Sequence, residues 1–371
     1  MGSDSGPVQI PRGKVISRRW RIIKKLGEGG CGAVYKVEDL QTKKEAALKA
    51  ESNFVSGGSV LKLEVQILRR LNNKPYAPQL IYSAKRESYS YIVMSLLGET
   101  LRHITKRLGK IFSVSTQVRV GVNTLFGLKQ IHDIGFVHRD IKPANMAIGQ
   151  RGTSEYRFVH ILDFGLAREY VVSSEGKLRM RRPRQRALFR GTTRYCSVGT
   201  HEKAEQGRVD DLWCLLYMLA ELRGPLPWAS ARDKREVYEL KKATDIEVVL
   251  ENCPVQFIKF AEHLGTLDYY TRPNYKLLYE LLIEVMKAGK FEYSDPYDWE
   301  TRHKSVESKE SCETVKARWT ASLSDGKKVS QSLSAERLST PVNKRAEKIY
   351  KLISDTNPFP AEFFSWNALG F

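Results

Sequence analysis

The sequence predicts an α+β protein of two lobes, a smaller sheet-rich lobe followed by a larger helical one. The chain has 371 residues, which is more than one ordinary hydrophobic core accommodates. Residues 20–97 consist mostly of short runs rich in Val, Ile and Tyr, bounded by glycine or charged turns, as is typical of strands. Residues 98–299 instead show the spacing of helices. We expect an extension over residues 1–19 and a tail over residues 300–371.

The first lobe should hold four strands and one helix. The strand-like runs are WRIIKKLGEGG, CGAVYKVEDL, KEAALKAE and SYIVMSLL. Between the third and fourth runs, SVLKLEVQILRRLNN places Leu61, Val65, Leu68 and Leu71 at helical spacing, which predicts an amphipathic helix. The lobe is therefore expected to end near Leu97.

The second lobe should be mostly helical. In STQVRVGVNTLFGLKQIHDIG, the residues Val118, Val122, Leu125 and Leu128 share one helix face. VDDLWCLLYMLAELRG is apolar on nearly all sides, so we expect a buried helix there. Beyond Trp299 the sequence is rich in Ser and charge, which is typical of a flexible tail. It ends in NPFPAEFFSWNALGF, whose aromatic residues predict docking in cis on the body or insertion into a partner. A disordered tail is the alternative.

Composition narrows the class of protein. Hydrophobic residues make up 42% of the chain and charged residues 28%, as in ordinary globular proteins. No run of 18 apolar residues predicts a membrane span, and the N-terminus lacks the apolar stretch of a secretory signal. The five cysteines are scattered without a CxxC pair, which argues against disulfides and zinc. That pattern suits a reducing compartment. We expect a cytoplasmic protein, with the nucleus as an alternative, and a monomer.

The net charge of +19 indicates anionic partners: nucleic acid, acidic lipid, or acidic and phosphorylated protein. The densest basic stretch is KLRMRRPRQRALFRGTTR, Lys177 to Arg194, with eight basic residues and no acidic one. No nucleic-acid recognition module and no basic stripe with interleaved aromatic residues is present. The sequence therefore favours protein partners over a specific nucleic acid.

A glycine-rich motif, LGEGGCGAVY, sets Gly27, Gly29 and Gly32 in GxGxxG spacing. Alone, this motif fits a Rossmann turn, a phosphate-covering hairpin or a flexible loop. A Rossmann turn needs a helix that begins at the last glycine, whereas AVYKVEDL is β-branched and alternating. We therefore expect a hairpin whose backbone N–H groups can approach phosphate oxygens.

Three further motifs supply charge. AALK contains Lys49, and LKLEVQIL contains Glu64; taken singly, each fits an ordinary surface residue. HRDIKPAN, residues 138–145, concentrates polar groups between two apolar segments, which by itself also fits a solvated turn. HILDFGLAR places Asp163 directly after an apolar strand and eighteen residues after Asn145, which suits a metal ligand. Together they offer a phosphate cradle, a cation with its carboxylate, and a metal site.

These motifs, in this order, resemble the signature set of the protein kinases. The resemblance covers residues 20–299 and implies the bilobal protein-kinase fold. Within the family the chain is similar to the casein kinase I group and to its tau-tubulin kinase branch. RGTTRYCSVGTHEKAEQGRVDDLWCLLYMLAEL replaces the usual Ala-Pro-Glu, and SDPYDWE lies near the domain end. One departure is Gly199, where the group usually has Asn; this bears on loop rigidity more than on chemistry.

The resemblance implies a kinase that transfers the γ-phosphate of ATP, with Mg²⁺, to Ser or Thr of proteins. Asp140 would orient the target hydroxyl, and Lys142 would balance charge at the γ-phosphate, a lysine that also indicates Ser/Thr specificity. Asn145 and Asp163 would bind Mg²⁺, a hard cation that prefers oxygen ligands. Lys49 would contact the phosphates and be held by Glu64. The expected ATP contacts are Leu26, Gly27, Glu28, Gly29, Gly32, Val34, Ala47, Lys49, Met94, Ser95, Leu97, Ala147 and Leu162.

Several neighbouring residues have simpler expected roles. His138 should be structural, Arg139 should brace the loop, and Asp211 should brace the same loop from the buried helix. For Thr192 a contact with Asp140 and a plain turn role are both open. For Cys31 an inert thiol is favoured over a reactive one.

The resemblance also implies substrates that are acidic or already phosphorylated. An anion site beside the substrate groove would suit them, because arginine donates two parallel hydrogen bonds to phosphate. The alternative is that these side chains pair with local carboxylates. The rival functions are a non-catalytic scaffold, disfavoured by the complete motif set, and a nucleic-acid-binding protein. The candidate anion-site residues are Arg190, Arg194, Lys234 and Arg235.

Overall fold

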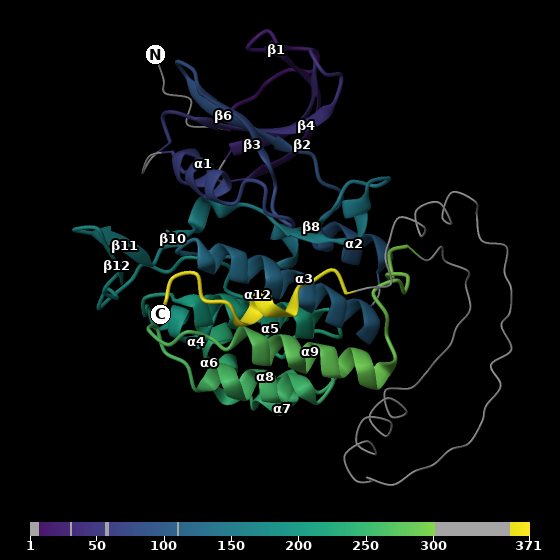
Figure 1. Ribbon diagram of the computed structural model, residues 1–371, viewed down its shortest axis with the longest axis vertical. Helices are drawn as coiled ribbons and strands as arrows, with labels where there is room; N and C mark the ends of the chain where they lie inside the picture. Colours follow the sequence, from purple (N-terminus) through teal and green to yellow (C-terminus); the bar gives the residue numbers. More distant parts are fainter. Residues whose placement is uncertain (1–6, 30–31, 56–58, 110, 301–356) are drawn as a thin grey trace, which may run out of the picture.

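The computed structural model describes residues 7–29, 32–55, 59–109, 111–300 and 357–371. Figure 1 shows two stacked lobes, with the sheet-rich lobe above and the helices below. The predicted bilobal α+β protein-kinase fold is confirmed. Among the described helices, none is both long and apolar enough to cross a membrane.

The upper lobe is one antiparallel sheet with strand order β1-β2-β3-β4-β6-β5 and a single helix, α1. Strand β3 alternates buried and half-buried residues, so its buried side faces a core that includes Trp20, Tyr35 and Leu48. The four predicted strands and the predicted helix are present. The short strand β1 and the edge strand β5 were not predicted. The bounds are β1 Val15–Ile16, β2 Trp20–Gly29, β3 Gly32–Asp39, β4 Glu45–Ser52, α1 Leu61–Arg70, β5 Leu80–Lys85 and β6 Tyr89–Ser95.

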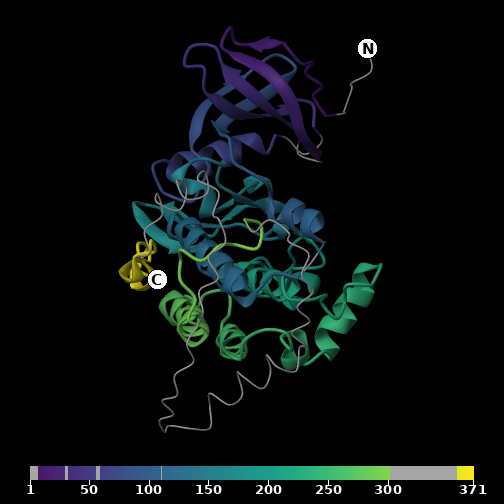
Figure 2. The same ribbon diagram turned by 90° about the vertical axis from the view of Figure 1, so that its right-hand side faces the viewer.

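The lower lobe is built around α3, which is buried along almost its whole length. Helix α3 begins after Ser113, whose side chain accepts a hydrogen bond from the backbone N–H of Thr116, an N-cap that satisfies one free helix donor. It packs against α5 and α9 (Figures 1 and 2). The two helices predicted for this lobe, now α3 and α5, are confirmed. The helices are α2 Leu101–Leu108, α3 Val114–Asp133, α4 Val198–His201, α5 Arg208–Glu221, α6 Lys234–Ala243, α7 Ile246–Val249, α8 Gln256–Gly265 and α9 Tyr275–Gly289.

Short paired strands lie between the lobes and position the polar motifs. Strand β8 pairs with β9, β10 pairs with β7, and β11 forms a hairpin with β12. The first two pairs fix the ends of the segment that contains Asp140 to the ends of the segment that contains Asp163. The elements are β7 Phe136–Val137, η1 Pro143–Asn145, β8 Met146–Ile148, η2 Ser154–Arg157, β9 Val159–Ile161, η3 Phe164–Leu166, β10 Arg168–Glu169, β11 Val171–Ser174 and β12 Lys177–Met180.

The C-terminal residues 357–371 lie against the lower lobe, across α3 and α9 (Figure 1, yellow). They include the short helix α12, Ala361–Ser365. Phe359 and Phe364 are buried in the same core as α3, and the Phe364 ring stacks on Tyr279 at 4.2 Å between centroids. Phe363 and Trp366 are largely exposed. The aromatic end therefore docks in cis, one of the alternatives that the sequence left open.

Candidate active site

Lys49 connects both lobes through two carboxylates. Its Nζ lies 2.7 Å from Glu64 Oε2 on α1 and 3.0 Å from Asp163 Oδ1. Although burial lowers the pKa of Lys49, the charges of Glu64 and Asp163 raise it above its ordinary value. Burial raises the pKa of Glu64, while Lys49 opposes that rise. The lysine is therefore fully charged and held in place, as a phosphate contact requires.

Asp163 adopts an uncommon backbone conformation with φ 64° and ψ 82°. Aspartate is one of the few residues that visit this left-handed region readily. The next residue, Phe164, is buried, and its ring meets His138 edge-on at 5.5 Å between centroids. Burial acts to raise the pKa of Asp163, but the charge and hydrogen bond of Lys49, together with His138 and the Gly165 N–H, lower that pKa overall. Asp163 is thus an anion facing the space between the lobes.

Asp140 lies at the centre of a network of donors. Its Oδ2 is 2.7 Å from Lys142 Nζ, and its Oδ1 accepts a hydrogen bond of 2.7 Å from the Thr192 hydroxyl. Asn145 donates from Nδ2 to the Asp140 carbonyl at 2.9 Å and to Oδ2 at 3.2 Å. Of the two readings of Thr192, the contact with Asp140 is the one observed. A threonine hydroxyl therefore already donates a hydrogen bond to this carboxylate.

Asp211 braces the loop that contains Asp140. Its two carboxylate oxygens accept hydrogen bonds from the backbone N–H groups of His138 and Arg139, each at 2.7 Å. Arg139 has φ 69°, a left-handed conformation that costs free energy for a residue with a side chain. Its Nε donates to the carbonyl of Leu166 at 2.7 Å. The predicted bracing roles of Asp211 and Arg139 are confirmed.

The glycine-rich motif forms the predicted hairpin between β2 and β3. Gly27 pairs with Val34, and Gly29 pairs with Gly32. Gly32 has φ +117°, and a Cβ there would lie 2.2 Å from the Ala50 carbonyl, so only glycine fits. A Cβ on Gly27 or Gly29 would instead project into open space. That space suits a phosphate chain. Cys31 lies outside the described residues.

The remaining expected ATP contacts come from both lobes. Val34 lies on β3, Ala47 on β4 and Met94 with Ser95 on β6, whereas Ala147 lies on β8. Ala47 and Ala147 are buried, and Leu26 is 42% exposed at the rim. The backbone N–H of Ser95 already donates to the Gln79 carbonyl at 3.0 Å.

The residues present fit a magnesium–nucleotide complex. Among the described residues, no group of three or more His, Cys, Asp or Glu side chains could hold a metal alone. Mg²⁺ is usually bound by one or two carboxylates together with substrate phosphates and waters. The anionic Asp163 and the amide oxygen of Asn145 are suitable oxygen donors, and Lys49 supplies the neighbouring cation. When bound, the ion neutralises phosphate charge.

The four candidate anion-site residues differ in their surroundings. Arg194 lies 2.7 Å from Glu221 Oε1 and also donates to the carbonyl of Ala229, so it has local partners. The Nζ of Lys234 lies 3.2 Å from the centre of the ring of Phe189, the residue that precedes Arg190 in the sequence. Arg190 and Arg235 are exposed. Arg194 therefore pairs with a local carboxylate, as one alternative expected, whereas Arg190 and Arg235 are exposed cations, as the other expected.

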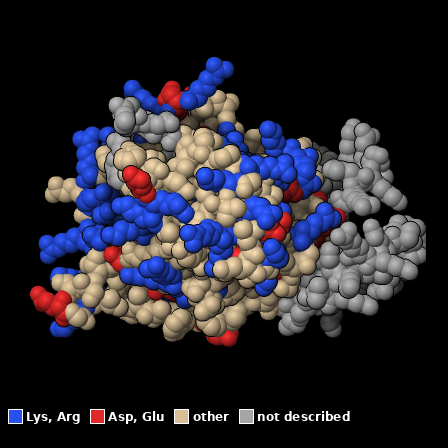
Figure 3. Space-filling view, turned by 90° about the horizontal axis from the view of Figure 1, so that it is seen from above, with Lys and Arg blue, Asp and Glu red and all other residues tan. Residues whose placement is uncertain are grey.

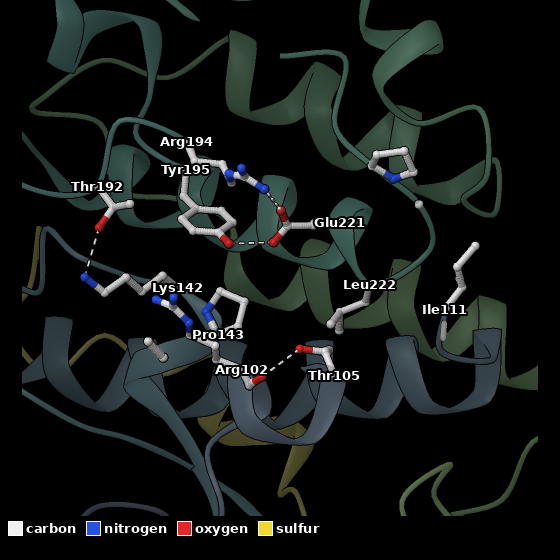
Figure 4. Close-up of a pocket in the computed structure, with 13 residues that line it drawn as sticks. Arg102, Thr105, Ile111, Lys142, Pro143, Thr192, Arg194, Tyr195, Glu221 and Leu222 are labelled. Atoms are coloured by element: carbon white, nitrogen blue, oxygen red, sulfur yellow. Dashed lines mark hydrogen bonds and ion pairs between the residues drawn. The ribbon is translucent and has the colours of Figure 1, made fainter. Parts of the chain in front are cut away.

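Sequence reasoning missed a pocket beside Asp140. It has a volume of about 570 Å³ and lies between α2, the Lys142 segment and the end of α5 (Figure 4). Arg102 and Glu221 line it. The signal available was weak, because each residue reads as an ordinary charge on a helix surface. Only the fold brings them together.

Comparison with known proteins agrees with this geometry. The family model described as the protein kinase domain matches residues 20–283. A Caenorhabditis elegans protein named as a serine/threonine-protein kinase, K06H7.1, is 48% identical over 82% of this chain and 88% of its own length. The C. elegans inactive tau-tubulin kinase ttbk-6 is 36% identical over 64% of this chain and 86% of its own. The C. elegans serine/threonine-protein kinase spe-6 is 32% identical over 77% and 76%.

Proposed function

This chain belongs to the protein kinase family and is a serine/threonine protein kinase similar to casein kinase I and the tau-tubulin kinases, and we propose that its substrates are acidic or already phosphorylated proteins. ATP is the phosphate donor that the domain implies, usually with Mg²⁺. We further propose that the protein acts as a monomer in the cytoplasm, or alternatively in the nucleus. The scattered cysteines support a reducing compartment of this kind.

The contacts support the residue roles that we propose. Asp140 would accept the proton of a substrate Ser or Thr hydroxyl, since the Thr192 hydroxyl already donates to it at 2.7 Å. Lys142, 2.7 Å from the other oxygen, would balance negative charge as the hydroxyl oxygen bonds to the γ-phosphorus and the bond from that phosphorus to ADP breaks. Lys49 would orient the phosphates, and Asn145 and Asp163 would hold Mg²⁺. Catalysis then rests on positioning and charge, which is what phosphoryl transfer requires.

The observation that supports anionic substrates is the charge of the segment that follows Asp163. Of the eight basic residues between Lys177 and Arg194, Arg181, Arg184 and Arg194 form ion pairs. The other five form no ion pair within the described part of the chain: Lys177, Arg179, Arg182, Arg186 and Arg190. Figure 3 shows Lys and Arg far outnumbering Asp and Glu on the face seen from above. A surface of this kind attracts acidic or phosphorylated segments.

The test compares three serine peptides, one neutral, one acidic and one with a phosphoserine near the target. The variant removes Lys234 and Arg235 together, because both are exposed and neither forms an ion pair with a described residue. We expect KM to rise several-fold for the acidic and phosphorylated peptides. KM for ATP and for the neutral peptide should stay unchanged. An equal loss on all three peptides would mean that these residues support the loop itself.

A matched control removes two cations elsewhere on the lower lobe. Lys259 on α8 and Lys287 on α9 carry the same total charge (Figure 1). Lys259→Ala with Lys287→Ala should leave the preference intact. If this control weakens acidic peptides equally, the effect is one of net charge and the local anion site is wrong.

A further inference from the structure

An open pocket of about 570 Å³ lies beside the catalytic residues (Figure 4). Lys142 and Thr192 line one end of it, and both contact Asp140. The walls include the apolar side chains of Ile111, Leu222 and Pro225. An extended chain advances about 3.3–3.6 Å per residue, so a side chain a few residues from the target can enter this pocket while the target hydroxyl stays at Asp140.

The pocket's only carboxylate among the described lining residues is already neutralised. Glu221 Oε1 lies 2.7 Å from Arg194 Nη1, and its Oε2 accepts a hydrogen bond of 2.5 Å from the Tyr195 hydroxyl. Burial, together with the Glu221 charge, raises the pKa of Tyr195, so this phenol stays protonated as the donor. A basic substrate side chain would have to displace Arg194. The pocket is therefore poorly suited to Lys or Arg.

The unmatched charge of the pocket is Arg102. It is exposed, lies in the first turn of α2, and forms no ion pair with any described residue. Arg102 and Tyr195 line the same pocket, and Figure 4 shows the Arg102 side chain rising from α2 toward the side of the pocket that holds Lys142 and Tyr195. A cation in the first turn of a helix is unfavourable for stability, because the helix N-terminus is itself positive. Arg102 and the helix terminus thus both favour an anion in this space.

We propose that this pocket is a substrate subsite for an acidic side chain close to the target Ser or Thr, with Arg102 as its specificity-determining residue. This inference rests on the proposed function and deepens it. Guanidinium binds a carboxylate through two parallel hydrogen bonds. The apolar walls contact the methylene groups, so glutamate fits better than aspartate. The subsite is separate from Lys234 and Arg235, which do not line this pocket.

The experiment is a set of neutral serine peptides in which one glutamate is moved through the positions on either side of the target. Each is paired with a glutamine peptide of the same shape. For the wild type we expect one position at which glutamate raises kcat/KM over glutamine by about tenfold, the magnitude of a partly exposed charge-assisted contact. Arg102→Ala should abolish that ratio through KM, with kcat and the KM for ATP unchanged. Arg102→Lys should restore part of it.

The matched control is Arg107→Ala, on the same helix, where Arg107 pairs with Glu99 at 2.8 Å. This variant should keep the wild-type ratio of kcat/KM between the glutamate and glutamine peptides. If Arg102→Ala lowers the glutamate and glutamine peptides equally, the subsite is overturned. If Arg102→Ala has no effect while Lys234→Ala with Arg235→Ala weakens the acidic peptides, the subsite is overturned and the proposed function stands. If the wild type never prefers glutamate or phosphoserine at any position, the Arg102 subsite and the proposed preference for acidic or phosphorylated substrates are both wrong.

Discussion

At the scale of single residues, a substitution of Asp163 tests the proposed metal site most directly. Its left-handed backbone is open to asparagine as well as aspartate, so Asp163→Asn keeps the conformation and removes the charge. We expect turnover to fall by roughly 10²–10³, the cost of one preorganised charge contact. Steady-state phosphorylation at physiological Mg²⁺, with melting temperature as a folding check, measures this. Wild-type turnover in the variant would remove Asp163 from the metal site.

His201 gives a residue-scale prediction on pH. Burial, reinforced by Lys241 and Lys234, lowers its pKa to about 4, while the unfolded chain retains the ordinary value of about 6.5. Between these values the unfolded state binds more protons, so the free energy of unfolding decreases as pH falls from about 6.5 toward 4. The contribution of neutral His201 to the free energy of unfolding is fully present above pH about 6.5.

The measurement for His201 is chemical denaturation at several pH values for wild type and His201→Phe. Phenylalanine can keep the ring contacts with Phe189 and Tyr238. The variant should lose stability less steeply across this window. Identical slopes for the two proteins would show that His201 does not titrate with unfolding.

At the scale of elements, the C-terminal segment 357–371 is a packed part of the lower lobe. Phe359 and Phe364 are buried, Arg272 donates to the Trp366 carbonyl at 2.8 Å, and Arg208 donates to the Phe371 carbonyl at 3.1 Å. Removing two buried aromatic side chains typically costs several kcal/mol, because each alone contributes about 3–5. Deleting residues 357–371 should therefore lower the melting temperature and expose α3 and α9 to hydrogen exchange.

A milder variant separates packing from chain length. Phe364→Ala removes the ring stacked on Tyr279 and should lower the melting temperature, whereas Trp366→Ala, at an exposed position, should change it less. If the deletion and Phe364→Ala both leave melting temperature and exchange unchanged, the docked arrangement is not populated in solution.

The sequence predicted those elements whose signal is local. The glycine hairpin follows from glycine spacing, α1 and α3 from apolar periodicity, and α5 from a run that is apolar on nearly all sides. Strand β5 was missed because an edge strand has few buried residues, and its burial pattern does not alternate. The Arg194–Glu221 pair and the Arg102 pocket depend on residues that are far apart in the sequence. No local sequence pattern indicates which surface charges the fold will bring together.

At the scale of the whole molecule, the net charge of +19 predicts a strong dependence on salt. Unpaired cations attract an acidic protein over a distance set by the Debye length, about 10 Å at 0.1 M salt and about 3 Å at 1 M. We expect kcat/KM for an acidic protein substrate to fall steeply as salt rises, because encounter slows. The value of kcat/KM for a neutral peptide should change little, since the buried Lys49–Glu64 ion pair is screened much less. Stopped-time phosphorylation at several ionic strengths, run in parallel on both substrates, measures the two slopes. Parallel slopes would mean that salt acts on the catalytic centre itself, and long-range attraction of the substrate by the basic surface would have to be abandoned.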